Sequence, residues 1–145
     1  MGYKEAAYNL ALLYEDELHN NTKAIQWYKI ADKRGHTIAA YNLALLYKNK
    51  LDNYKEAIQW YEVAINKGNL KAFNNLGYLY HTVLKDDANS AQYYLPLIGN
   101  AYSKEKVLNF LKNKWHFSDA TIQKGYELQL KSKVIPEKLK YKGGI

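Results

Sequence analysis

The nine residues AAYNLALLY occur twice in this 145-residue sequence, at Ala6–Tyr14 and again, unchanged, at Ala39–Tyr47. When the chain is aligned with itself at that offset of 33, residues 6–38 and 39–71 are identical at 18 of 33 positions. A third copy begins at Ala72 as AFNNLGYLY and keeps five of the nine letters. Internal similarity with a period of about 20 to 50 residues is typical of repeat proteins. The chain is therefore expected to be a short array of similar packing modules.

Each module is predicted to be two amphipathic helices joined by a short polar segment. Apolar residues at helical spacing lie on both sides of that segment, at Leu10, Leu13, Tyr14, Ala24, Trp27, Tyr28 and Ala31, and again at Leu43, Leu46, Tyr47, Ala57, Trp60, Tyr61 and Ala64. Gly35 and Gly68 follow the second helix, where a left-handed cap residue belongs. One helix pair cannot bury its apolar face alone, so stacking of neighbouring pairs is expected to stabilise the array.

The two repeated tryptophans, Trp27 and Trp60, are expected to fill the groove between the helices, while the small alanines let the helices approach closely. Truncating either buried indole to alanine would then cost about 3 to 5 kcal/mol.

The repeat pattern changes towards the C-terminus. Pro96 stands where the second helix of the third copy would continue, so that helix is predicted to end or kink there. Two further helices are predicted, with buried stripes at Val107, Leu111 and Trp115 and, after a capping Ser118, at Ile122, Tyr126 and Leu130. The predicted organisation is repeats over residues 1–100 (about 4–35, 37–68 and 70–99, the third degenerate), capping helices over 101–131, and a loosely docked basic tail over 132–145.

The repeated pattern resembles the Sel1-like repeat, a relative of the tetratricopeptide repeat. The matching positions in the first copy are Ala7, Asn9, Leu10, Ala11, Tyr14, Ala24, Trp27, Tyr28, Ala31 and Gly35, and the set recurs from Ala40 to Gly68. The likeness covers about residues 4 to 95. Only the third copy has the family's usual glycine, Gly77 where the second has Ala44, and the loops lack the family's glycine-rich connection. The resemblance implies an all-α fold, a short right-handed α-solenoid whose concave face holds a partner.

The same resemblance implies a non-catalytic protein–protein interaction module. The most specific hypothesis is a bacterial cytoplasmic immunity protein that binds and occludes a cognate secreted toxin or effector. An adaptor or scaffold in a signalling or secretion complex is the alternative, and binding of nucleic acid through the basic C-terminal helices is a third hypothesis.

The candidate partner-binding residues lie on the first helix of each pair, at positions that the packing pattern does not use. They are Tyr8, Asn9, Leu12, Glu15, Tyr41, Asn42, Leu45, Lys48, Asn74, Asn75, Tyr78 and His81. Glu15, Lys48 and His81 occupy one register and differ in charge, as expected of a recognition surface, although ordinary surface drift would give the same variation. The asparagines Asn9, Asn42 and Asn75 can hold a peptide backbone, because an amide is both donor and acceptor, or can tie neighbouring helices together.

Catalysis, metals and cofactors find little support in the sequence. The histidines His19, His36, His81 and His116 lie in different predicted elements, cysteine is absent, and no glycine-rich loop precedes a helix. The acidic runs at 15–17 and 86–87 are expected to be solvated turns. No enzyme activity, no metal site and no bound cofactor are therefore expected.

The net charge of +7 is concentrated in the last third of the chain, where residues 101–145 hold ten lysines against four acids. The lysines of the two predicted capping helices accompany aromatic residues, which favours either nucleic acid or an acidic protein as partner: Lys104, Lys106, Lys112, Lys114, Lys124, Lys131 and Lys133. The absence of a nucleic-acid motif and the assignment of Trp115 to the core favour the acidic protein, for which charge speeds encounter.

Location and self-association are predicted from the start of the sequence. No apolar run approaches the roughly 20 residues of a membrane helix, and the first residues lack the apolar stretch of a signal peptide. A cytoplasmic protein without membrane contact is expected. Because no helix precedes the first repeat, Tyr3, Ala7 and Leu10 are predicted to lie open and to permit a weak homodimer.

Overall fold

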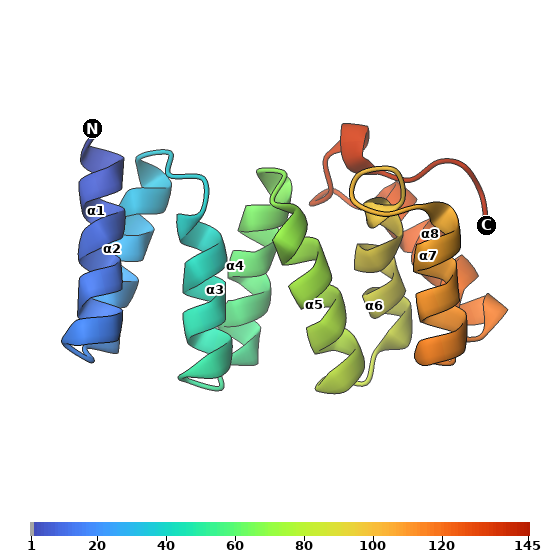
Figure 1. Cartoon of the computed structure of the whole chain (residues 1–145), viewed down its shortest axis with the longest axis horizontal. Coiled ribbons are helices and arrows are strands. Elements are labelled where there is room, and N and C mark those ends of the chain that lie inside the picture. Colours follow the sequence, from blue (N-terminus) through green and yellow to red (C-terminus); the bar gives the residue numbers. More distant parts are fainter. Residues whose placement is uncertain (1) are drawn as a thin grey trace. The chain divides into compact units, whose positions relative to one another are not determined.

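A computed structural model describes residues 2–145, and over these residues the chain is helical without a β-strand (Figure 1). Contacts divide it into two compact units, residues 1–69 and 70–145, so the predicted boundary at residue 100 lies inside the second unit. The first unit contains α1 (Tyr3–Leu12), α2 (Asn21–Lys33), α3 (Ala39–Asn49) and α4 (Tyr54–Asn66). The second contains α5 (Leu70–Thr82), α6 (Asp87–Tyr94), α7 (Lys104–Asn109) and α8 (Asp119–Lys131).

Four short helical turns complete the two units. The π-helical turns η1 (Leu13–Glu17) and η3 (Phe110–Lys114) extend α1 and α7, and the 3-10 turns η2 (Leu95–Leu97) and η4 (Glu137–Leu139) follow α6 and α8. Pro96 lies in η2, which confirms that the third repeat's second helix ends early.

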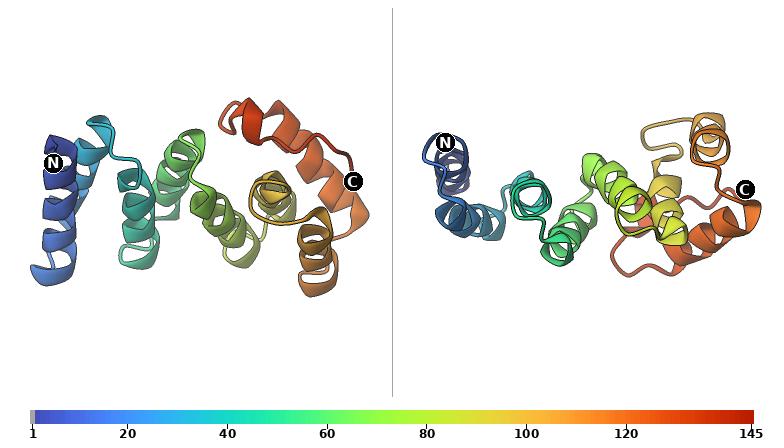
Figure 2. Two further views of the ribbon diagram at one scale, coloured as in Figure 1. Left: turned by 45° about the horizontal axis from the view of Figure 1, so that its top comes forward. Right: turned by 90° about the horizontal axis from the view of Figure 1, so that it is seen from below.

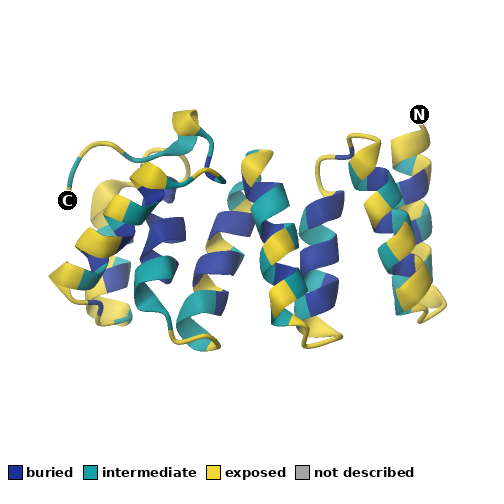
Figure 3. Cartoon of the chain, turned by 180° about the vertical axis from the view of Figure 1, so that it is seen from behind, coloured by how far each residue is buried: buried dark blue, intermediate teal, exposed yellow. Residues whose placement is uncertain are grey.

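Consecutive helices pack in pairs within each unit (Figure 2). In the first unit α1 packs on α2, α3 on α4, and α2 also on α3. In the second unit α5 packs on α6, and α6 packs on α8. Most helices bury one face and expose the other (Figure 3), as the helical spacing of their apolar residues predicts. No helix among residues 2–145 combines the length and apolar character needed to cross a bilayer.

The turns inside the three repeats are built alike. Each has a residue with positive φ followed by a helix cap whose backbone amide donates to a tyrosine carbonyl, and the cap side chain accepts from the amide three residues later. In the order positive-φ residue, cap and tyrosine, with the distance from the cap nitrogen to the tyrosine oxygen, the three sets are His19, Asn20 and Tyr14 (2.8 Å), Asp52, Asn53 and Tyr47 (2.9 Å), and Lys85, Asp86 and Tyr80 (2.9 Å). After the second helix, Gly35 and Gly68 have φ of 93° and 87°, which confirms the predicted left-handed caps.

The segment predicted as capping helices uses a similar turn, in which the helix cap comes one residue later. His116 has a φ of 60°, and the Phe117 amide donates to the Leu111 carbonyl at 2.9 Å. The Ser118 hydroxyl then accepts from the Thr121 amide at 3.1 Å, which confirms the predicted cap of α8. In local conformation, η3 and α8 therefore continue the helix–turn–helix plan of the repeats although the sequence pattern has faded.

The tyrosine, not the tryptophan, is the buried aromatic of each second helix in the first unit. Tyr28 and Tyr61 are 0% exposed, whereas Trp27 and Trp60 are only half-buried. The prediction that the indoles fill the groove was therefore wrong. Adjacent helix positions differ by about 100°, and the direction of the neighbouring helix decides which of the two rings it covers.

The predicted stripes of the last two helices were also partly wrong. The buried residues of α8 are Ile122, Gly125 and Gln129, whereas Leu130 is exposed. A Cβ atom at position 125 would lie 2.5 Å from the Ala91 Cβ of α6, so glycine lets these two helices meet backbone to backbone. Trp115 is half-buried too, because the helix before it ends in a π-turn that takes the ring out of the expected stripe.

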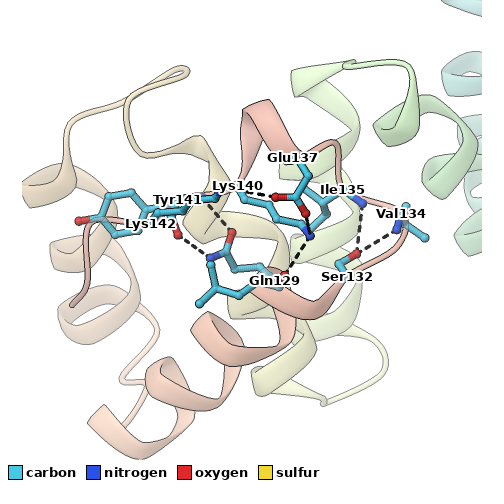
Figure 4. Close-up of polar contacts among 9 residues, drawn as sticks. Gln129, Ser132, Val134, Ile135, Glu137, Lys140, Tyr141 and Lys142 are labelled. Carbon is cyan, nitrogen blue, oxygen red and sulfur yellow. Dashed lines mark hydrogen bonds and ion pairs between the residues drawn. The ribbon is translucent and has the colours of Figure 1, made fainter.

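The residues after α8, predicted to be a loosely docked tail, are held firmly against the second unit (Figure 4). The Gln129 amide donates to the Tyr141 carbonyl at 2.6 Å and accepts from the Tyr141 amide at 2.9 Å. Ile135 is 3% exposed, and the Lys140 ammonium contacts Glu137 and donates to the Leu130 carbonyl at 2.9 Å. We call residues 132–145 the C-terminal strap.

The predicted open N-terminal end is closed in part. Ala7 is 1% exposed because it packs in the pair formed by α1 and α2, and Leu10 is half-buried. Only Tyr3 of the three is exposed, with the Arg34 guanidinium 4.5 Å from its ring centroid.

Candidate functional site

Two of the predicted partner-binding residues of the first unit, Tyr8 and Asn42, contact each other. The Asn42 amide donates to the Tyr8 hydroxyl at 2.8 Å, which ties α3 to α1. The Tyr8 ring stacks on His36 with a centroid distance of 4.0 Å and lies 6.1 Å from the ring of Tyr28. The pKa of Tyr8 is raised by burial. Asn42 therefore ties neighbouring helices together, which is one of the two roles predicted for the repeated asparagines.

Glu15 belongs to the same polar network rather than to a solvated turn. Its carboxylate accepts from the Tyr28 hydroxyl at 2.7 Å and pairs with Lys50 at 2.9 Å, and its side chain is 15% exposed. Burial and this hydrogen bond raise the pKa of Tyr28, so the hydroxyl stays protonated and donates at neutral pH. The expectation of a solvated turn was wrong for Glu15, because the η1 turn directs it back over α2.

The second repeat lacks this network. Lys48 replaces Glu15 at the equivalent position, and the Tyr61 hydroxyl is buried without a hydrogen-bond partner among the described residues. Burial raises the pKa of Tyr61 as well. An unsatisfied buried hydroxyl carries a desolvation cost of about 1 to 3 kcal/mol.

The two equivalent tyrosines should therefore respond in opposite directions to removal of the hydroxyl. Tyr28→Phe is expected to lower the free energy of unfolding by about 1.5 to 3 kcal/mol, because a hydrogen bond to a carboxylate is lost. Tyr61→Phe is expected to leave that free energy unchanged or raise it by about 1 kcal/mol, because no bond is lost. Urea unfolding followed by circular dichroism measures both, and equal losses in the two variants would contradict the assignment.

The other predicted residues of the first unit differ in exposure. Asn9 is exposed, and four more residues are half-buried, namely Leu12, Tyr41, Leu45 and Lys48. The ring centroid of Tyr41 lies 6.3 Å from that of Tyr61, which repeats the tilted contact of Tyr8 with Tyr28.

The four predicted residues of the second unit divide between structure and surface. The Asn75 amide donates to the Lys71 carbonyl of its own helix at 3.0 Å. His81 lies 2.7 Å from an Asp87 carboxylate oxygen and stacks on the Trp115 ring at 4.2 Å. Asn74 is exposed, and Tyr78 is 49% exposed.

Trp115 is the centre of an aromatic cluster in the second unit. Five rings surround it at centroid distances of 4.2 to 6.1 Å: His81, Phe110, Tyr94, Phe117 and Tyr78. These neighbours engage the indole within the protein. The cluster therefore forms a packed wall of rings that holds its aromatic members in place, and it does not form an open aromatic cage around an empty space.

A cavity of about 200 Å³ opens beside this wall, and it is the candidate site. Its lining is almost wholly apolar and comes from α5, α6, α7 and the segments flanking α7: Asn74, Tyr94, Tyr102, Lys106, Val107 and Phe110. We call it the aromatic pocket. Tyr102 is 42% exposed at its edge, and the Lys106 ammonium lies 4.5 Å from the Tyr102 ring centroid.

Tyr94 forms the floor of the aromatic pocket and depends on Gly77. A Cβ atom at position 77 would overlap the Tyr94 ring, so the glycine gives the ring its place against α5. Tyr94 is 5% exposed, and burial and the nearby Tyr102 and Tyr78 hydroxyls raise its pKa. The phenol is therefore neutral at physiological pH and can only donate or accept a hydrogen bond.

Sequence reasoning included Asn74 among the site residues and Lys106 among the lysines that favour a charged partner, but it did not select the other lining residues. Tyr94 was assigned to the repeat core, and Tyr102, Lys106 and Phe110 lie in a segment where the repeat register is lost. A further signal in the sequence is the change from Ala44 to Gly77, because it marks where a large side chain is admitted.

The lining of the aromatic pocket offers an amide, two phenols, one ammonium and hydrocarbon. Residues 2–145 contain no group of three or more histidine or acidic side chains that could hold a metal ion.

Comparison of the chain with protein-family models, with curated proteins and with solved structures gave no match.

Proposed function

We propose that this chain is a non-catalytic protein-binding module of Sel1-like helical repeats, acting in the cytoplasm, and that the aromatic pocket is where its partner binds. The observation that carries the proposal is an open apolar cavity with an exposed tyrosine at its edge, Tyr102 at 42% exposure, and a second exposed tyrosine, Tyr78 at 49%, in the aromatic cluster around Trp115. Exposed aromatic residues around an apolar depression are characteristic of protein-recognition surfaces, because a ring contributes a large contact area at little entropic cost.

The resemblance to Sel1-like repeats supports the same class of function. In its most specific form the proposal is an immunity protein that covers the active site of a bacterial toxin, and an adaptor in a signalling complex has the same physical basis with a different partner. Protection of cells by co-expression of the chain with a neighbouring toxin gene would separate the two.

Affinity capture from a lysate of the source organism tests the binding module, with Asn74→Trp as the variant that fills the pocket. Asn74 is exposed, so the indole can enter the cavity without loss of a buried contact. Asn9→Trp is the matched control, an exposed asparagine on the first helix of the first unit. We expect a protein that the wild type and the control retain and that Asn74→Trp loses.

Two results would contradict this proposal. Loss of the captured protein with Asn9→Trp alone would move the binding surface to the first unit. Retention of nucleic acid rather than protein, with a steep dependence on salt, would make the basic helices the functional surface.

A further inference from the structure

Two lysines next to rings of the aromatic pocket differ from those lysines of the second unit that pair with carboxylates. Lys112 pairs with Asp119 at 3.1 Å, and Lys140 contacts Glu137. Lys106 and Lys114 have no carboxylate partner among the described residues and instead lie over aromatic rings, 4.5 Å from the Tyr102 centroid and 5.3 Å from the Phe110 centroid. Both of these rings line the pocket; Lys106 itself is a lining residue, and Lys114 lies next to the lining residue Phe110.

The surrounding segment reinforces this charge. Residues 101–116 contain four lysines and one acid, Glu105. Opposite charge on a partner would therefore be attracted to this side of the second unit and oriented there before contact.

The size of the pocket limits what enters it. About 200 Å³ is below the roughly 300 to 1,000 Å³ typical of sites for cofactors and small molecules. A single large side chain of a polypeptide, such as leucine, phenylalanine or tryptophan, is of the right size for this cavity. The apolar lining, with Tyr94 as its floor, also suits such a side chain.

The same lysines disfavour a nucleic acid base as the occupant. Stacking of a base needs an open ring face. Lys106 lies over one face of the Tyr102 ring, and Lys114 lies over one face of the Phe110 ring. The indole of Trp115 is engaged by rings of the protein itself. The arrangement offers ammonium groups and a cavity rather than a stacking platform.

We infer that the aromatic pocket takes one large apolar side chain from an acidic polypeptide segment, with carboxylates of that segment bound to Lys106 and Lys114. The inference rests on the proposed function and adds the chemistry of the partner. The pocket provides most of the affinity, because a buried anchor side chain typically dominates an interface. The two lysines determine which sequences around the anchor are accepted.

Selection of random linear peptides displayed on phage against the full chain tests this inference. We expect the enriched peptides to share one large apolar residue with Asp or Glu within a few positions. In fluorescence polarisation of the synthetic peptides, alanine at the apolar position should weaken binding at least about 30-fold. Lys106→Glu should weaken it about tenfold, and the wild-type affinity should fall with added salt.

Three variants make the result specific. Asn74→Trp should abolish binding, whereas Lys124→Glu, the same charge reversal at an exposed position of α8 outside the pocket lining, should leave it within about twofold. Thermal unfolding by circular dichroism shows that each variant is folded. Lys114→Glu is the second charge variant and should act in the same direction as Lys106→Glu.

The other outcomes separate the inference from the proposed function. Peptides that depend on the pocket but carry no acidic residue, or that bind Lys106→Glu unchanged, would overturn the inference and leave the binding module in place. Enrichment of no peptide sensitive to Asn74→Trp would contradict both. Binding of single-stranded DNA that Asn74→Trp abolishes would also overturn both, in favour of base recognition.

Discussion

Tyr28→Ala is expected to lower the free energy of unfolding by about 3 to 5 kcal/mol, the typical cost of truncating a buried aromatic side chain. Tyr28 is 0% exposed in the groove between α1 and α2, and its hydroxyl donates to Glu15. Alanine would leave a cavity that the rigid helix pair cannot close, and it would remove one donor from a carboxylate that is largely buried.

The neighbouring Trp27→Ala is the matched comparison, because it removes a larger ring from the next residue of the same helix. Trp27 is half-buried, so its side chain hides less apolar surface from water per atom than that of Tyr28. The loss of unfolding free energy should therefore be clearly smaller for Trp27→Ala than for Tyr28→Ala. Urea unfolding of both variants, followed by circular dichroism, gives the two free energies. A loss for Trp27→Ala equal to that for Tyr28→Ala would restore the indole as the main packing residue of the repeat.

Gln129→Ala is expected to lower the free energy of unfolding of the second unit by about 2 to 6 kcal/mol. The Gln129 side chain is 0% exposed and makes both a donated and an accepted hydrogen bond with the backbone of Tyr141 (Figure 4). Alanine cannot make either bond, so the backbone N–H and C=O of Tyr141 lose their partners. Each lost partner costs about 1 to 3 kcal/mol while the two groups stay away from water. Detachment of the strap would return both groups to water.

Limited proteolysis reports the detachment directly. In Gln129→Ala the C-terminal strap should be cleaved faster than in the wild type, at its lysines, because its main attachment to α8 is gone. Gln123→Ala is the control, since Gln123 is exposed on the same helix and bonds only to Glu127 at its surface. Equal proteolysis of the strap in the wild type and Gln129→Ala would show that other contacts, such as the burial of Ile135, hold it.

The predictions that depended on local chemistry agree with the structure. Repeated helix pairs, the glycine caps at Gly35 and Gly68, the Ser118 cap and the helix end at Pro96 follow from interactions between residues a few positions apart. The sequence contains all of the partners in those interactions, so a pattern of residues is sufficient to identify them.

The predictions that depended on which face of a helix packs against a neighbouring element were less successful. The choice of Tyr28 over Trp27 as the buried ring, and of Gln129 over Leu130, depends on the direction from which another helix or the strap approaches. Two adjacent positions on a helix have nearly the same local pattern, and only the neighbouring element distinguishes them. For the same reason Glu15 and Asn42 were predicted to face a partner, although they bond to Tyr28 and Tyr8.

The sequence by itself determined the modules: their period of 33 residues, their helix-pair character and the places where helices begin and end. Only the tertiary structure decided the functional surface. The aromatic pocket brings together Asn74 of α5, Tyr94 of α6 and Phe110 after α7, residues that lie far apart in the chain, the last of them in a segment where the repeat register is lost. Such a cavity exists because α5, α6 and α7 leave a space that their own side chains do not fill, and packing of this kind depends on the shapes of distant surfaces rather than on any local preference.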